Sequence, residues 1–129
     1  MKGTIKWFDL RKGYGFVTDY EGKDVFIHYT DIQMENYRYF NEGDIVNFHV
    51  VVGGDGRKRA IHVKPVVTLQ MVADVLENNG LHLQAIKNNS KEKKYLVIDK
   101  SNNLQTDEKG ISLVEVAEYA GFEIKELVA

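Results

Sequence analysis

Hydrophobic and polar residues alternate in short runs through the first half of the chain. Because successive side chains of a strand point to opposite faces, these runs predict half-buried strands. The strands are expected at residues 3–9, 15–19, 24–28, 45–52 and 59–63. Turn clusters that contain Gly separate them at residues 10–13, 20–23 and 53–56. Five short strands within about 65 residues indicate a small closed barrel.

The hydrophobic period changes after Pro65, the only proline of the chain. Leu69, Val72, Ala73 and Leu76 follow helical spacing, and the segment ends at Asn78-Asn79-Gly80. A hairpin at 81–86 and 95–98, a helix from Ser112 to about residue 120 and a last strand at 122–128 are expected next. Ser112 and Glu115 match a capping box. The pattern therefore predicts a barrel domain over 1–65 and a small α+β domain over 66–129, with the order α-β-β-α-β.

Composition and charge divide the chain in the same place. Residues 1–65 hold 10 Lys and Arg against 9 Asp and Glu, whereas 66–129 hold 7 against 10, and the whole chain has a net charge of −2. Eleven of the 14 aromatic residues lie in the first 65 positions. A protein that coats nucleic acid by charge alone is therefore not expected. The rings of the first half need a separate explanation.

Other features of the composition exclude several classes of protein. The chain has no Cys, which excludes disulfide scaffolds, thiol catalysis and cysteine-bound zinc. No apolar run reaches the roughly 18 residues of a membrane span, and the first residues lack the apolar core of a signal peptide. We expect a cytoplasmic protein with no metal and no cofactor.

The sharpest motif is Lys12-Gly-Tyr-Gly-Phe-Val17, which fits the first six positions of the RNP1 pattern. If the motif lies on a strand, Lys12, Tyr14 and Phe16 share one face. Phe26 and His28 alternate in the same way one strand later, and Lys6 and Trp7 place a cation beside a ring on the first strand. Because Val17, Val25 and Ile27 already supply the core, the rings are expected to form an exposed patch of the kind that binds ligands.

Gly3-Thr-Ile-Lys-Trp-Phe8, Lys12–Val17 and Asp24-Val-Phe-Ile-His28 together resemble a bacterial-type cold-shock domain over about residues 1–65. The resemblance implies an all-β, five-stranded antiparallel OB-type barrel that binds single-stranded DNA or RNA without catalysis. Lys and Arg would contact phosphates, the rings and His28 would stack on bases, and Asp24 would accept hydrogen bonds from base edges. The implied contact residues are Lys6, Trp7, Lys12, Tyr14, Phe16, Asp24, Phe26, His28, Tyr29, Tyr37 and Arg38.

Several positions depart from the family pattern or fit it only marginally. Asp9 replaces the usual Asn and places a carboxylate near the expected phosphate path. Phe8 is a marginal candidate for the binding face, since the core explains it equally well, as it does Phe40 and Phe48. Arg57, Lys58 and Arg59 replace the usual Gly-Pro step before the last strand. They are either a basic finger that contacts nucleic acid or a solvated turn.

The role of residues 66–129 stays open at this stage. The main hypothesis is a nucleic-acid-binding module such as an RNA chaperone. The alternative is a scaffold whose second domain binds a protein partner or a second copy of the chain. A metal-dependent nuclease using Asp99, Asp107 and Lys109 is a weak third hypothesis, because the acidic loop shows no supporting pattern. Competition of the acidic half for the 57–59 cations, an autoinhibition, is a further speculation.

Overall fold

The structure is a computed structural model that describes residues 1–34, 38–86 and 93–123. The chain divides into two compact units, Met1–Thr68 and Leu69–Ala129. The observed division after Thr68 lies three residues beyond Pro65, where the sequence predicts the boundary.

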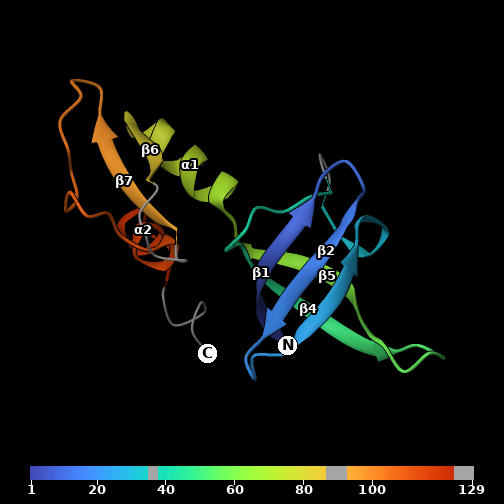
Figure 1. The fold of residues 1–129 in the computed structure, drawn as a ribbon. Coiled ribbons are helices and arrows are strands. Elements are labelled where there is room, and N and C mark those ends of the chain that lie inside the picture. The colour runs from blue at the N-terminus through green and yellow to red at the C-terminus, as the bar shows by residue number, and fades with distance from the viewer. Residues whose placement is uncertain (35–37, 87–92, 124–129) are drawn as a thin grey trace. The chain divides into compact units, whose positions relative to one another are not determined.

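Unit 1 is a closed barrel, of which Figure 1 labels β1, β2, β4 and β5. Its five strands follow the order β1-β2-β3-β5-β4. Its strands are β1 (Lys2–Asp9), β2 (Tyr14–Asp19), β3 (Asp24–His28), β4 (Ile45–Val52) and β5 (Lys58–Val67). A 3-10 turn, Tyr29–Asp31, follows β3. The predicted five-strand barrel is confirmed, and the predicted and observed strands overlap closely.

One ladder of the barrel differs from the all-antiparallel prediction. β3 and β5 pair in parallel, through Phe26 and Arg59, whereas the other four ladders are antiparallel. The reason is geometric, because each antiparallel step around a closed ring reverses the strand direction. A ring of five strands returns to its starting direction only if the number of reversals is even. At least one parallel pair is therefore unavoidable.

The last strand of the barrel also continues through Pro65, where the sequence predicts an end. Val46 pairs with Pro65 and Ile45 pairs with Val67, and the register shifts between these two pairs. Proline lacks the N–H that a regular ladder needs, and sheets accept it mainly at edges and irregularities. The register shift beside Pro65 provides such an irregular site.

The barrel core is built mainly from branched aliphatic side chains that alternate along the strands. Val17, Val25 and Ile27 are fully buried, together with Val46 and Val63. Phe40 and Phe48 are also buried, as the core interpretation of these rings predicts. The core is therefore complete without the rings of β2 and β3.

The described part of unit 2 contains two helices and a two-stranded antiparallel sheet. Its elements are α1 (Leu69–Asn78), β6 (Leu81–Ile86), β7 (Lys94–Asp99) and α2 (Leu113–Tyr119). Val72 and Leu76 of α1 and Val116 of α2 are buried. The Ser112 hydroxyl accepts the Glu115 N–H while the Glu115 carboxylate accepts the Ser112 N–H, so the capping box is present. The predicted strand at 122–128 falls mostly outside the described residues.

Candidate nucleic-acid interface

The outer face of the β2–β3 hairpin carries rings because of the strand alternation. Tyr14 pairs with His28 and Phe16 pairs with Phe26 across the ladder, and all four side chains are partly exposed. The residues that alternate with them, including Val17, Val25 and Ile27, are buried. The predicted division between ring-bearing and core-facing positions is confirmed for these two strands.

Trp7, Tyr14, Phe16 and Phe26 form a continuous cluster, which we call the ring patch. The ring centroids of Trp7 and Phe16 are 5.3 Å apart, and those of Trp7 and Tyr14 are 5.8 Å apart. Phe26 lies 5.8 Å from both Tyr14 and Phe16. All four pairs are tilted or edge-on rather than stacked flat, so the rings support one another by their edges. Partly exposed ring faces of this kind are platforms on which planar ligands can stack.

A bulge in β1 brings Lys6 and Trp7 to the outer surface together. Ile5 pairs with Val17, but the next pair is Trp7 with Phe16, so Lys6 is an extra residue without a partner in the β1–β2 ladder. Lys6 and Trp7 are consecutive and both exposed, which strict alternation would not allow. The bulge therefore places a cation directly beside the ring patch.

Asp24 anchors the Lys6 cation at the edge of the ring patch. The Lys6 ammonium donates to Asp24 Oδ2 at 2.7 Å, and the Thr18 hydroxyl donates to Asp24 Oδ1 at 3.0 Å. The hydrogen bond from Lys6, followed by that from Thr18, lowers the pKa of Asp24 below its ordinary value. Asp24 is therefore firmly ionised at neutral pH. Its remaining lone pairs can still accept hydrogen bonds from a base edge.

Phe8 does not join the ring patch. Its ring packs against the hydrophobic core and meets Phe40 edge-on, with ring centroids 6.5 Å apart. The marginal expectation that Phe8 lies on the binding face is therefore not met. The β1 bulge shifts the alternation by one residue, and this shift turns Trp7 outward and Phe8 toward the core.

Lys12 lies in the β1–β2 turn and not on a strand, because β2 begins only at Tyr14. The predicted strand face shared by Lys12, Tyr14 and Phe16 is therefore wrong for Lys12. The turn instead brings Lys12 together with Tyr29 and Arg38 around a hollow of about 280 Å³. These three predicted contact residues thus lie close together, whereas Tyr37 falls outside the described residues.

Asp9 has a structural role in the same turn that the sequence does not reveal. Its Oδ1 accepts the backbone N–H groups of Arg11 and Lys12, both at 2.9 Å. The Gly13 N–H donates to the Asp9 carbonyl at 2.8 Å, and the Gly13 carbonyl accepts the Tyr29 N–H at 2.8 Å. Gly13 has a φ of 76°, and a Cβ there would lie 2.6 Å from the Tyr29 ring. The close contact therefore requires glycine.

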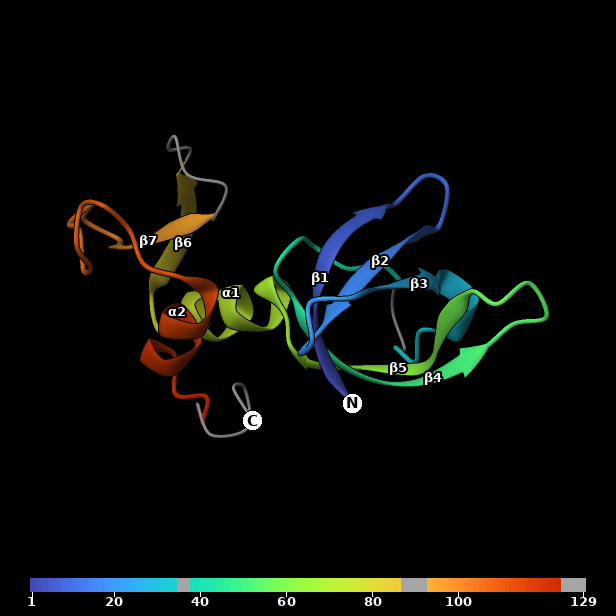
Figure 2. The same cartoon turned by 60° about the horizontal axis from the view of Figure 1, so that its bottom comes forward.

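The β4–β5 hairpin projects beyond the body of the barrel (Figure 2). Phe16 and Phe26 line a hollow of about 670 Å³ together with Val51, Arg57, Lys58 and Arg59. Arg59 Nε lies 3.5 Å from Asp31 Oδ2, and Arg57 Nε lies 3.8 Å from Asp55 Oδ2. The structure thus brings the three cations to the ring patch. Val51 was missed, although its position in the β4 alternation could have indicated it.

The comparison with known protein families decides the identity of the barrel. Residues 1–66 match the family described as "'Cold-shock' DNA-binding domain". The chain belongs to this family. The resemblance inferred from the three motifs is confirmed.

Relatives of the cold-shock domain match about half of the chain. A cold shock-like protein of Thermotoga maritima is 48% identical over 66 residues, which are 51% of this chain and 98% of that protein. Cold shock protein CspB of Bacillus caldolyticus is 44% identical over 63 residues, 49% of this chain and 96% of that protein. Glycine-rich protein 2 of Nicotiana sylvestris is 49% identical over 63 residues, 48% of this chain but 29% of that protein. The assignment supports nucleic-acid binding in a general sense.

Asp99 and Asp107, the two carboxylates of the nuclease hypothesis, have local structural roles. Asp99 Oδ1 accepts the N–H groups of Ser101 and Asn103 at 2.9 and 2.8 Å, and Asp107 Oδ1 accepts the N–H of Lys109 at 2.8 Å. These carboxylates close turns, which accounts for their presence without a nuclease site. Within the described residues, no group of three or more His, Asp or Glu side chains is arranged to hold a metal ion. None of the described helices has the length and apolar character needed to cross a membrane.

Proposed function

We propose that the cold-shock domain binds single-stranded RNA or DNA by stacking unpaired bases on the ring patch. The observation that carries this proposal is the position of Trp7, Tyr14, Phe16 and Phe26 outside a core that is already filled by other side chains. An exposed cluster of rings has no structural requirement here and is the usual mark of a binding surface. Every nucleobase has a flat face, so stacking of this kind tolerates many sequences.

Cations on both sides of the ring patch support the same proposal. Lys12 and Arg38 lie at the β1–β2 turn, and Arg57, Lys58 and Arg59 lie at the β4–β5 hairpin. A strand whose bases stack on the ring patch would bring its phosphates past both groups. Lys6 would contact a phosphate near Trp7, with Asp24 available to a base edge. This arrangement favours the basic-finger interpretation of residues 57–59.

The selection for single strands follows from the stacking itself. Bases in a duplex are stacked on one another and paired, so their faces are not available to protein rings. A protein that binds only the unpaired form shifts the equilibrium toward that form by mass action. We infer that the chain acts as a non-enzymatic RNA chaperone or regulator that keeps its targets unpaired.

The test uses Trp7, the only tryptophan of the chain, which is 39% exposed within the ring patch. Oligothymidine and oligouridine are titrated in turn at two salt concentrations while tryptophan fluorescence is recorded. We expect saturable quenching that weakens at the higher salt, because bound phosphates displace counterions. An unchanged emission together with no shift of either oligomer in a gel would contradict the proposal.

Two variants and a matched control assign the binding to the ring patch. Phe16→Ala and Phe26→Ala are each expected to weaken binding by about 1–3 kcal/mol, the usual contribution of one base stack. Tyr20→Ala removes a ring that is 74% exposed in the β2–β3 turn, away from the ring patch, and is expected to bind normally. Circular dichroism establishes that each variant is folded. Equal losses in all three variants would show that the effect is not stacking on the ring patch.

A further inference from the structure

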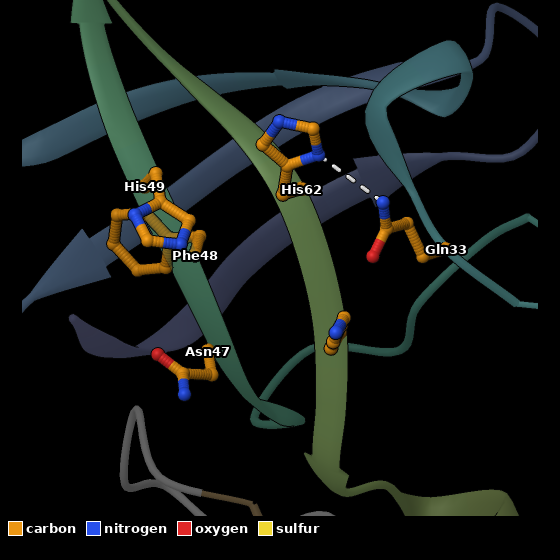
Figure 3. A pocket seen from close by; sticks show the side chains of 6 residues that line it. Gln33, Asn47, Phe48, His49 and His62 are labelled. Atoms are coloured by element: carbon orange, nitrogen blue, oxygen red, sulfur yellow. Dashed lines mark hydrogen bonds between the residues drawn. The ribbon is translucent and has the colours of Figure 1, made fainter.

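The outer surface of β4 and β5 carries a second hollow, separate from the ring patch. It measures about 250 Å³ and is lined by Gln33, Asn47, Phe48, His49, His62 and Lys64 (Figure 3). We call it the histidine groove. In this view β4 and β5 lie in front, and the strands near the N-terminus run behind them. None of its lining residues belongs to the interface described above.

A bulge in β5 creates this groove. His49 pairs with Ile61 and Asn47 pairs with Lys64, so three steps along β5 face two steps along β4. His62 has a φ of 50°, the left-handed conformation that residues other than glycine rarely adopt. Regular alternation from buried Ala60 would direct residue 62 into the core. The bulge instead leaves Val63 buried and turns His62 to the surface.

The side chains of the groove are suited to an anion. The imidazole rings of His49 and His62 lie edge-to-face with centroids 6.0 Å apart, and Gln33 Nε2 lies 3.1 Å from His62 Nδ1. Lys64 is the cationic side chain of the groove, and no Asp or Glu is found among the described residues that line it. A lysine in a groove lined without carboxylates repels metal cations and attracts phosphate. Imidazole and amide N–H groups add hydrogen-bond donors.

The exposed face of β4 connects the ring patch to the histidine groove. Val51 lines the hollow of the ring patch, while His49 and Asn47 line the histidine groove. These three residues alternate on the exposed face of β4. Four residues of a strand span about 13 Å. A nucleic-acid strand that leaves the ring patch at Arg57–Arg59 can therefore follow β4 into the groove.

We propose that the histidine groove binds backbone phosphates of the same single strand whose bases occupy the ring patch. A long oligonucleotide then bends around the β4–β5 hairpin, whereas a short one occupies the ring patch alone. This inference rests on the proposed single-strand binding and extends its footprint to another face of the barrel.

The four histidines of the chain are built-in reporters for this path. His28 lies beside the ring patch, His49 and His62 lie in the groove, and His82 lies on β6 of unit 2. Their ring signals are followed by NMR at constant pH while oligothymidines of ~6 and ~14 nucleotides are added, a range that covers OB-fold site sizes. We expect His28 to shift with both oligomers, His49 and His62 with the long one only, and His82 with neither.

The outcomes separate this inference from the proposed function. If the long oligomer shifts His28 but leaves His49 and His62 unmoved, the groove is not on the path, and the single-strand proposal stands alone. If neither oligomer shifts His28 or quenches Trp7, the proposed function fails, and this inference fails with it.

A paired substitution supplies the energetic test. His49→Gln combined with Lys64→Gln is expected to weaken binding of the long oligomer roughly fivefold or more. The slope of the logarithm of its affinity against the logarithm of salt concentration should fall by about 0.7 for each phosphate that is no longer neutralised. Binding of the short oligomer should not change.

The matched control is His82→Gln with Lys100→Gln, which makes the same changes in unit 2 and should alter neither affinity. Circular dichroism establishes that both double variants are folded. A weakening that is equal for the two oligomers, or no weakening at all, would overturn the inference.

Discussion

The β2–β3 hairpin of the barrel and the β6–β7 hairpin of unit 2 are both antiparallel, but they expose different side chains. The outer positions of β2 and β3 carry Tyr14, Phe16, Phe26 and His28, whereas β6 exposes His82 and Gln84. A ring does occur on β7, where Tyr95 is buried. The aromatic ring on β7 is therefore buried, whereas the rings on β2 and β3 are partly exposed. The comparison shows that exposed rings are not a requirement of a stable hairpin and points to binding as their purpose.

The largest expected effect comes from separating the two units. We expect residues 1–68 to fold and to bind oligothymidine as the full chain does, because a relative matched over 66 residues is covered almost completely by this region. We expect residues 69–129 to bind at least about 100-fold more weakly, since β6 and β7 offer no exposed ring patch. Fluorescence anisotropy with a labelled oligomer measures both.

This experiment also tests the acidic character of the second half. Tighter binding by residues 1–68 than by the full chain would show that unit 2 competes with nucleic acid for the barrel. Binding by residues 69–129 that is less than about 100-fold weaker than that of the full chain would contradict the contrast between the two hairpins.

A second prediction separates the cores of the two units. Leu76 is buried in unit 2, and Leu76→Ala is expected to lower the free energy of unfolding of that unit by about 2–5 kcal/mol. The barrel should keep its stability, because the barrel core contains no side chain of unit 2. Urea denaturation followed by Trp7 fluorescence reports the barrel, and far-UV circular dichroism reports the helices of unit 2. A matching shift of the Trp7 transition would show that the two units unfold together.

A third prediction concerns the glycine between two rings of the patch. A Cβ at Gly15 would lie 2.1 Å from the Trp7 carbonyl oxygen and 2.7 Å from Phe8 Cα. Gly15→Ala is therefore expected to destabilise the barrel by about 1–3 kcal/mol through forced separation of β1 and β2. Gly54→Ala is the control, because a Cβ at Gly54 meets no atom within 4 Å. Equal melting temperatures for the two variants would contradict the close approach of β1 and β2.

The smallest predicted effect concerns the cap of α2. Ser112→Ala is expected to lower the stability of unit 2 by about 1 kcal/mol at pH 7, the usual loss for such a cap. The hydrogen bonds from the backbone and then the hydroxyl of Ser112 lower the pKa of Glu115 below its ordinary 4.5. Stabilisation by the ionised carboxylate is therefore complete above that value and is lost as the pH falls through the lowered pKa.

The measurement for this cap is thermal unfolding of the wild type and of Ser112→Ala between pH 7 and pH 3. The difference in melting temperature should shrink toward the acidic end, because the Ser112 hydroxyl, which the variant lacks, donates to the ionised Glu115 carboxylate at 3.0 Å. The backbone N–H of residue 112 is present in both proteins and does not contribute to the difference. A difference that does not depend on pH would show that the Ser112 hydroxyl stabilises the helix only by accepting the Glu115 N–H.

Local patterns explain why much of the interface could be predicted. Alternation placed Tyr14, Phe16, Phe26 and His28 outside, because a strand repeats every two residues. The alternation fails at Lys6, where β1 has a bulge, and at Lys12, which lies in the β1–β2 turn. Neither is visible as a period, since a bulge depends on how the partner strand is held. Phe8 and Lys12 were therefore misplaced, while the rings of β2 and β3 were not.

The sequence by itself determined most of the strands and helices of the described residues, that Val17, Val25 and Ile27 face the core, and that the rings that alternate with them stay outside the barrel. These are consequences of side-chain size and polarity repeated along a few neighbouring residues. Only the tertiary structure decided that β3 pairs in parallel with β5, that Arg57–Arg59 border the ring patch, and that His49 and His62 share one groove. Closure of the ring and the bulges in β1 and β5 join residues far apart in the chain, and these contacts depend on the whole barrel and not on any local pattern.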